Sequence, residues 1–172
     1  MGENNMKRII CTFLIIVVLI LSLASCDVIP GVGDNGQGDE NISLFEVDID
    51  GFKNSEDDKT KSTFEKVQSV KLSNTTDYII EVVGKGRGPS DVVIRVQIDK
   101  DGKIVEVKTL SHNELPIGSE QLEDGKYNSS FVGKTRVECE AVDIVAGCTI
   151  TTSGFKDAVL VAFSAYEIIN AK

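Results

Sequence analysis

Alternating apolar and polar residues mark the middle of the chain as a β-sheet. A mostly apolar run predicts a strand over residues 78–83, and apolar side chains at every second position predict another over residues 92–98. Residues 99–102 supply a turn in which Gly102 tolerates a positive φ, and residues 103–110 return as the partner strand. The sequence therefore predicts an antiparallel sheet built around a β-hairpin.

Helical spacing of apolar residues predicts helices before and after this sheet. Residues 55–58 could cap a helix, with acids in its first turn, that would carry Phe64, Val67 and Val70 on one side. A short strand is predicted from residue 137 to residue 145. The final helix reaches the C-terminus, and its inner face comprises Phe155, Ala158, Val159, Ala162, Tyr166 and Ile169. The predicted fold class is α+β: a small antiparallel sheet with a hairpin core and a C-terminal helix packed on it.

The N-terminal residues have the pattern of an export signal. Lys7 and Arg8 precede an apolar run that ends in small residues, and the run is shorter than the ~20 residues of a membrane-spanning helix. The Leu-Ala-Ser-Cys sequence ending at Cys26 resembles a bacterial lipobox, which implies a signal peptide over residues 1–25 and acylation of Cys26. An uncleaved anchor is the alternative. Residues 26–44 are poor in apolar side chains and predict a flexible linker, which leaves residues 45–172 as the folded domain.

Charge and residue usage exclude several functional classes. A net charge of −9 opposes binding to nucleic acid. His112 is the only histidine and no Cys/His cluster has ligand spacing, so neither a zinc site nor any other metal site is expected. Cys139 and Cys148 could form a disulfide outside the cytoplasm or remain as two thiols. No arrangement typical of catalytic residues is present, so none is assigned.

Candidate binding chemistry is concentrated in residues 143–153, where small and hydroxyl-bearing residues open into the final helix. Gly147 leaves room for close approach of a ligand, and Thr149, Thr151 and Thr152 place hydroxyls where a helix exposes unpaired N–H groups. Such a helix end suits a phosphate, although Ser and Thr also occur there simply as caps.

Two other loops could belong to the same site. Residues 84–88 carry glycine at alternate positions and could admit a flat ligand, or they could be only a connection between strands. His112 and Glu114 lie in a polar segment at the exit of the hairpin, where they could contact a ligand or be solvated turn residues. Because both loops leave the same predicted sheet, we expect them to flank one cleft beside the N-terminus of the last helix.

These features, in this order, resemble the FMN-binding domain family, which includes the flavin-carrying subunits of sodium-pumping NADH:quinone reductase and of Rnf-type complexes. The resemblance is strongest over residues 78–172 and rests on the glycine loop, the Asp-Gly hairpin, a His-x-Glu-x-Pro segment and an Asp-x-x-x-Gly-x-Thr motif. It implies that Thr149 carries FMN through a phosphoester bond installed by a flavin transferase. The implied cofactor-binding residues are Thr149, Asp143, Gly147, Cys148, Thr151, Thr152, Gly86, Gly88, His112 and Glu114.

Two functions of different kinds follow from this resemblance. The first is an extracytoplasmic, lipid-anchored flavoprotein that transfers electrons from a membrane-bound redox donor to an unknown acceptor. It would be a carrier or a redox-complex subunit rather than a stand-alone enzyme. The alternative is a binding or assembly lipoprotein that keeps the fold without the flavin. A reductase with its own small substrate is a third candidate, but His112 is the only acid or base that could handle such a substrate.

Overall fold

The computed structural model describes residues 44–74, 76–87 and 91–171, which all fall in one compact unit. The predicted signal peptide, Cys26, all but the last residue of the predicted linker, and Gly88 lie outside the described residues.

A five-stranded antiparallel meander forms the frame of the domain. Its order is β1 (Leu44–Glu46), β2 (Val67–Ser73), β3 (Tyr78–Gly84), β4 (Val92–Ile98) and β5 (Ile104–Ser111), each strand pairing with the next. Ile80 pairs with Val96, and Val96 pairs with Val107, so one row of apolar side chains crosses three strands. Gly102 has a φ of +74° in the β4–β5 turn. The predicted α+β class and hairpin are therefore confirmed.

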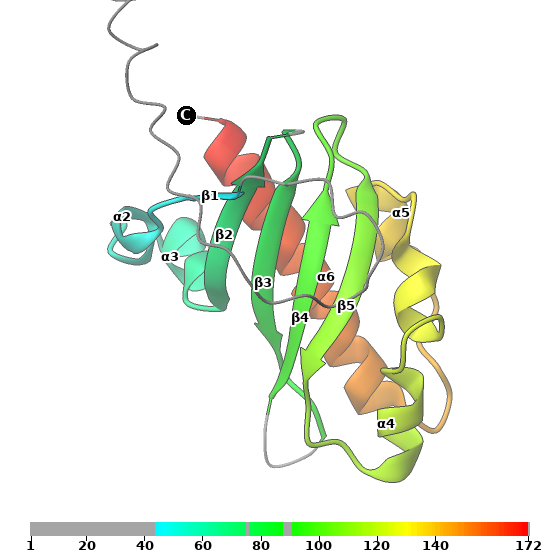
Figure 1. The fold of residues 1–172 in the computed structure, drawn as a ribbon. Coiled ribbons are helices and arrows are strands. Elements are labelled where there is room, and N and C mark those ends of the chain that lie inside the picture. Colours follow the sequence, from blue (N-terminus) through cyan, green and yellow to red (C-terminus); the bar gives the residue numbers. More distant parts are fainter. Residues whose placement is uncertain (1–43, 75, 88–90, 172) are drawn as a thin grey trace, which may run out of the picture. The chain divides into compact units, whose positions relative to one another are not determined.

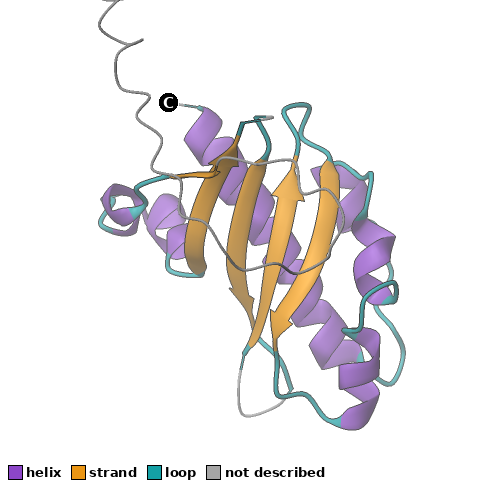
Figure 2. Ribbon diagram, in the orientation of Figure 1, coloured by secondary structure: helices purple, strands orange, loops and turns teal. Residues whose placement is uncertain are grey.

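The long helix α6 (Thr149–Asn170) covers one face of this sheet, crossing it diagonally against β3 and β4 (Figures 1 and 2). Phe155, Val159 and Ala162 of α6 are buried against Ile80 and Ile94 of the sheet. Because the strands alternate, their other face carries polar side chains such as the Glu81–Arg95 ion pair, whose atoms are 2.8 Å apart. The predicted final helix is confirmed.

Shorter helices flank the two edges of the sheet. Near β2 lie α2 (Asp50–Lys53) and α3 (Asp58–Phe64). Beyond β5 lie α4 (Pro116–Gln121), the 3-10 helix η1 (Tyr127–Phe131) and α5 (Arg136–Glu140) (Figure 1). No helix in the described part of the chain is both long enough and apolar enough to span a membrane.

Two sequence expectations about these helices were wrong. The helix predicted from the acidic cap ends at Phe64, and Val67 and Val70 instead bury their side chains from strand β2. The strand predicted over residues 137–145 is α5 followed by a turn. Thr135 caps α5 reciprocally with Glu138, whose carboxylate accepts from the Thr135 N–H at 2.8 Å. This capping box outweighs the β-propensity of the apolar residues that follow.

Candidate functional site

The N-terminus of α6 is left open by its own sequence. Thr149 is the first helical residue and is exposed, and Cys148 occupies the N-cap position without a side-chain hydrogen bond to the helix. Gly147 just before it has a φ of +83°, and a Cβ at that position would meet no atom within 4 Å. The first N–H groups of α6 and the Thr149 hydroxyl therefore lie beside open space, where the helix dipole favours an anion.

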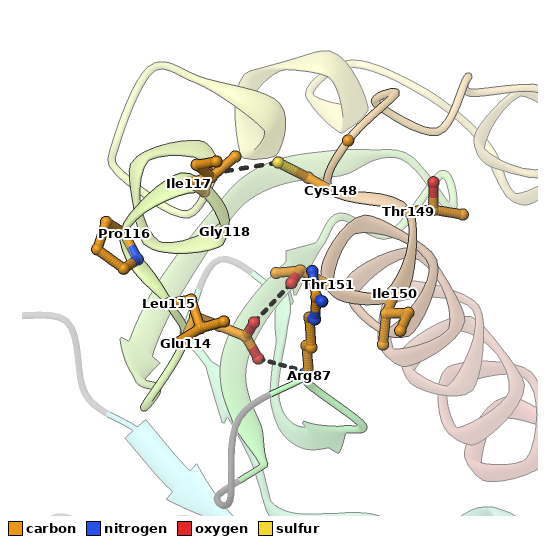
Figure 3. Close-up of a pocket in the computed structure, with 11 residues that line it drawn as sticks. Arg87, Glu114, Leu115, Pro116, Ile117, Gly118, Cys148, Thr149, Ile150 and Thr151 are labelled. Carbon is orange, nitrogen blue, oxygen red and sulfur yellow. Dashed lines mark hydrogen bonds between the residues drawn. The ribbon is translucent and has the colours of Figure 1, made fainter.

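A pocket of about 590 Å³ opens at this helix end, within the range of ~300–1,000 Å³ that is usual for small-molecule sites. Three segments far apart in sequence form it: the glycine loop after β3, the start of α4 and the start of α6 (Figure 3). The side chains and glycines that line it are Arg87, Glu114, Leu115, Pro116, Ile117, Gly118, Gly147, Cys148, Thr149, Ile150 and Thr151.

Glu114 joins the three segments of the pocket. Its Oε1 accepts a hydrogen bond from the Arg87 N–H at 2.7 Å, and its Oε2 accepts one from the Thr151 hydroxyl at 2.6 Å (Figure 3). A second tie holds α4 to α6, because the Cys148 thiol donates to the Ile117 carbonyl at 3.3 Å. These contacts fix the walls of the pocket relative to one another.

Apolar side chains leave part of the pocket suited to a flat, weakly polar group. Leu115, Ile117 and Ile150 are 56%, 67% and 54% exposed, so each presents apolar surface to water at the pocket. Arg87 is the only cation among the lining residues, and its guanidinium forms no ion pair with any residue that the structure describes. The pocket thus combines an open helix N-terminus, one positive charge and an apolar surface. That combination fits an aromatic ligand with an anionic end.

The structure brings five of the sequence-predicted residues together in this pocket: Glu114, Gly147, Cys148, Thr149 and Thr151. The glycine loop after β3 also reaches the pocket, because Arg87 lines it. Both polar loops therefore border the cleft beside the last helix.

Four of the other predicted residues lie outside the pocket lining. Asp143 is exposed and does not line it. Thr152 is buried and used structurally, since its hydroxyl donates to the Cys148 carbonyl and accepts from the Val145 N–H. Gly86 packs against Glu114, and His112 borders a different hollow beside Thr109, where its Nδ1 accepts from the Glu114 N–H at 3.3 Å.

Sequence reasoning missed six residues of the pocket: Arg87, Leu115, Pro116, Ile117, Gly118 and Ile150. Ile117 and Ile150 are large, exposed and apolar, which often marks a binding surface, but exposure becomes visible only in the fold. Gly118 has a clearer role, because a Cβ there would lie 2.8 Å from the Thr151 hydroxyl oxygen and 3.0 Å from Glu114 Oε2.

Two titratable groups outside the pocket are strongly perturbed by burial. Burial, with smaller contributions from the charges of Asp143 and Asp157, raises the pKa of Tyr127 to about 12. Burial likewise raises the pKa of the Cys139 thiol to about 11. Cys139 and Cys148 are both free and buried, as the two-thiol alternative expects. No group of three or more His, Cys, Asp or Glu side chains in the described segments could hold a metal.

Comparison with known proteins identifies the ligand class. Residues 88–164 match the FMN-binding domain family. The chain is also 29% identical over 102 residues to one of the subunits of a proton-translocating ferredoxin:NAD(+) oxidoreductase complex from Clostridium ljungdahlii, an alignment that covers 52% of this chain and 55% of that protein. The chain thus spans about half the length of this curated relative.

The resemblance drawn from the sequence motifs is therefore confirmed: residues 88–164 match an FMN-binding domain, and both comparisons indicate FMN as the cofactor. The residues present fit this ligand. The open N-terminus of α6 and Arg87 suit a phosphate, and the apolar side chains suit an isoalloxazine ring.

Proposed function

We propose that this protein is an extracytoplasmic, membrane-tethered flavoprotein that carries FMN covalently on Thr149 and transfers electrons. The observation that carries the proposal is the position of Thr149. Thr149 is an exposed, hydroxyl-bearing residue at the start of a 22-residue helix, it lines the pocket, and no side chain caps the helix end beside it. A phosphoester at this oxygen puts the remaining phosphate charge at the positive end of the helix dipole, worth about 0.3–1 kcal/mol at an exposed position.

Other residues of the pocket hold and shield the cofactor. Leu115, Ile117 and Ile150 offer apolar surface to the ring, and Glu114 fixes the walls on which these side chains are mounted. FMN, when bound, supplies reversible electron transfer through its isoalloxazine ring. Asp143 is exposed but does not line the pocket, which favours a role in recognition by a flavin transferase over direct contact with the cofactor.

The cellular setting belongs to the same proposal. Cleavage before Cys26 and acylation of its thiol tether the domain to the outer face of the membrane through the linker of residues 26–44. The relative from Clostridium ljungdahlii is part of a proton-translocating ferredoxin:NAD(+) oxidoreductase complex, which supports a membrane-bound redox donor as the partner. A flexible tether would let one domain meet this donor and then an acceptor.

Flavin fluorescence in a denaturing gel tests covalent attachment. The full chain is exported from a host that contains a flavin transferase, together with Thr149→Val and, as a matched control, Ser153→Ala. Ser153 is a hydroxyl one turn further along α6 that does not line the pocket. We expect fluorescent bands for wild type and Ser153→Ala and none for Thr149→Val. A wild-type protein that releases all its flavin on denaturation refutes the covalent link. One that never acquires flavin supports the flavin-free binding lipoprotein.

A further inference from the structure

The contacts of Glu114 suggest a role that a simple ligand contact would not give it. Its two carboxylate oxygens hold two groups that are 27 and 37 residues away in sequence, the Arg87 N–H and the Thr151 hydroxyl, at 2.7 and 2.6 Å. Hydrogen bonds to a carboxylate at these distances are among the stronger ones in proteins. Glu114 therefore ties the glycine loop to the first turn of α6.

Two glycines leave the space that this tie requires. A Cβ on Gly86 would overlap Glu114 Oε1, and a Cβ on Gly118 would lie 3.0 Å from Oε2. Residues on both sides of the carboxylate thus allow it to sit between the loop and the helix. The residues that contact Glu114 are far apart in sequence, and two glycines leave space for its carboxylate. The tertiary fold therefore sets the position of this carboxylate.

The hydrogen bond to Glu114 fixes the position of Arg87. Its backbone is held by Glu114, while its guanidinium forms no ion pair with any described residue and lies more than 4 Å from the carboxylates of Asp and Glu there. Figure 3 shows the side chain extending from the loop along the α6 side of the pocket. The lining residues contain one cation and one carboxylate, so without Arg87 an anionic ligand would meet a pocket of net negative charge.

We infer that Glu114 is a positioning residue that holds Arg87 at the pocket, and that the Arg87 guanidinium selects the phosphate of FMN. The inference rests on the proposed function in taking this pocket as the FMN site. It adds to the proposed function that phosphate recognition belongs to Arg87, which lies outside the Asp-x-x-x-Gly-x-Thr motif. Glu114 acts through Arg87 and Thr151, and it does not contact the phosphate itself.

Free FMN and riboflavin are suitable probes, because they differ only in the phosphate. The full chain is produced without a flavin transferase, and the Kd of each flavin is measured by fluorescence quenching. We expect wild type to prefer FMN by roughly 10-fold or more, as for a hydrogen-bonded ion pair. Arg87→Gln should bring the ratio close to one, mainly by weakening FMN.

Glu114→Ala separates positioning from simple electrostatics. Removing a negative charge from the pocket would by itself strengthen FMN binding, whereas loss of the tie should weaken it and lower the FMN preference as Arg87→Gln does. Glu114→Gln should restore the preference, since its amide oxygen can accept from the Arg87 N–H and its amide nitrogen can donate to Thr151. Glu120→Ala is the matched control, because it removes the same charge from an exposed position on α4 outside the pocket lining.

The outcomes separate this inference from the covalent attachment. Equal Kd values of wild type for FMN and riboflavin overturn phosphate selection, as does an Arg87→Gln protein that keeps the preference. Tighter FMN binding by Glu114→Ala overturns the positioning role. None of these ratios depends on the Thr149 hydroxyl, so failure of flavin attachment at Thr149 leaves them unchanged.

Discussion

Replacing Gly154 by alanine should destabilise the domain, although the same change stabilises most helices. Gly154 lies in the second turn of α6, where a Cβ would sit 1.9 Å from the Lys85 carbonyl oxygen and 2.8 Å from its carbon. Ordinary contact begins at 3.4 Å, so the helix and the loop would have to separate by about 1.5 Å, the difference between 3.4 and 1.9 Å. Both are backbone, so neither can rotate away.

The change in the free energy of unfolding caused by Gly154→Ala is the difference between two opposing effects. Alanine in a helix interior gains about 1 kcal/mol over glycine, whereas overpacking a close contact costs about 1–3 kcal/mol and more when backbone must move. We expect a net loss of about 1–2 kcal/mol in the free energy of unfolding. The displaced Lys85 lies two residues before Arg87, so the pocket should be perturbed as well.

Urea denaturation of the flavin-free chain measures this loss. Gly51→Ala is the control, because Gly51 is helical in α2 and a Cβ there would meet nothing within 4 Å. That variant should be as stable as wild type or up to about 1 kcal/mol more stable. A Gly154→Ala protein that matches or exceeds wild-type stability would show that the close approach of α6 to the glycine loop does not constrain the fold.

Three further predictions concern residues outside the pocket. Burial pushes the pKa of Glu81 upward, but hydrogen bonds from Arg95 and Ser69 outweigh it and hold the pKa below the ordinary 4.5. The ionised Glu81 side chain therefore stabilises the fold at neutral pH, and this stabilisation is lost as the pH falls below 4.5. Glu81→Gln should cost about 0.2–1 kcal/mol at pH 7 in urea denaturation, and the difference should shrink in acid; a pH-independent difference would contradict this. Burial raises the pKa of Cys139 to about 11, so its thiol should resist iodoacetamide at pH 8 in the folded protein and react once the protein is unfolded. Peptide mass measures the alkylation, and rapid alkylation of the folded protein would contradict the burial of Cys139. Cys26→Ala should abolish lipoprotein processing, and a variant that still partitions with membranes at the processed size would indicate a plain N-terminal anchor.

The sheet and the last helix could be predicted because their patterns are local and regular. Alternation over residues 92–98 is typical of a strand with one buried face, and Gly102 in the following turn favours a hairpin. Val67 and Val70 misled because three-residue spacing also occurs in strands that carry an irregularity, and the register of β2 shifts between Val67 and Ser69. The helix α5 had a usable sign in its capping box, since Thr135 and Glu138 stand three residues apart.

Part of the pocket could be predicted from the sequence, but much of its wall could not. Thr149, Gly147 and Glu114 stand in short motifs whose chemistry can be read locally. Arg87 enters the pocket only because a carboxylate 27 residues further along holds its N–H, and sequence spacing does not encode such a contact. Ile117 belongs to the pocket because α4 packs beside α6, which is a property of the tertiary fold.

Peptide mass spectrometry of the exported protein tests the central claim most directly. Trypsin cleaves after Arg136 and Lys156, so residues 137–156 form one peptide that contains Thr149 together with Thr151, Thr152 and Ser153. Protein exported alongside a flavin transferase should yield this peptide with the mass of FMN less one water, and fragmentation should place the addition on Thr149. An unmodified wild-type peptide, or an FMN addition that persists in Thr149→Val, would contradict the assignment of Thr149 as the flavin carrier.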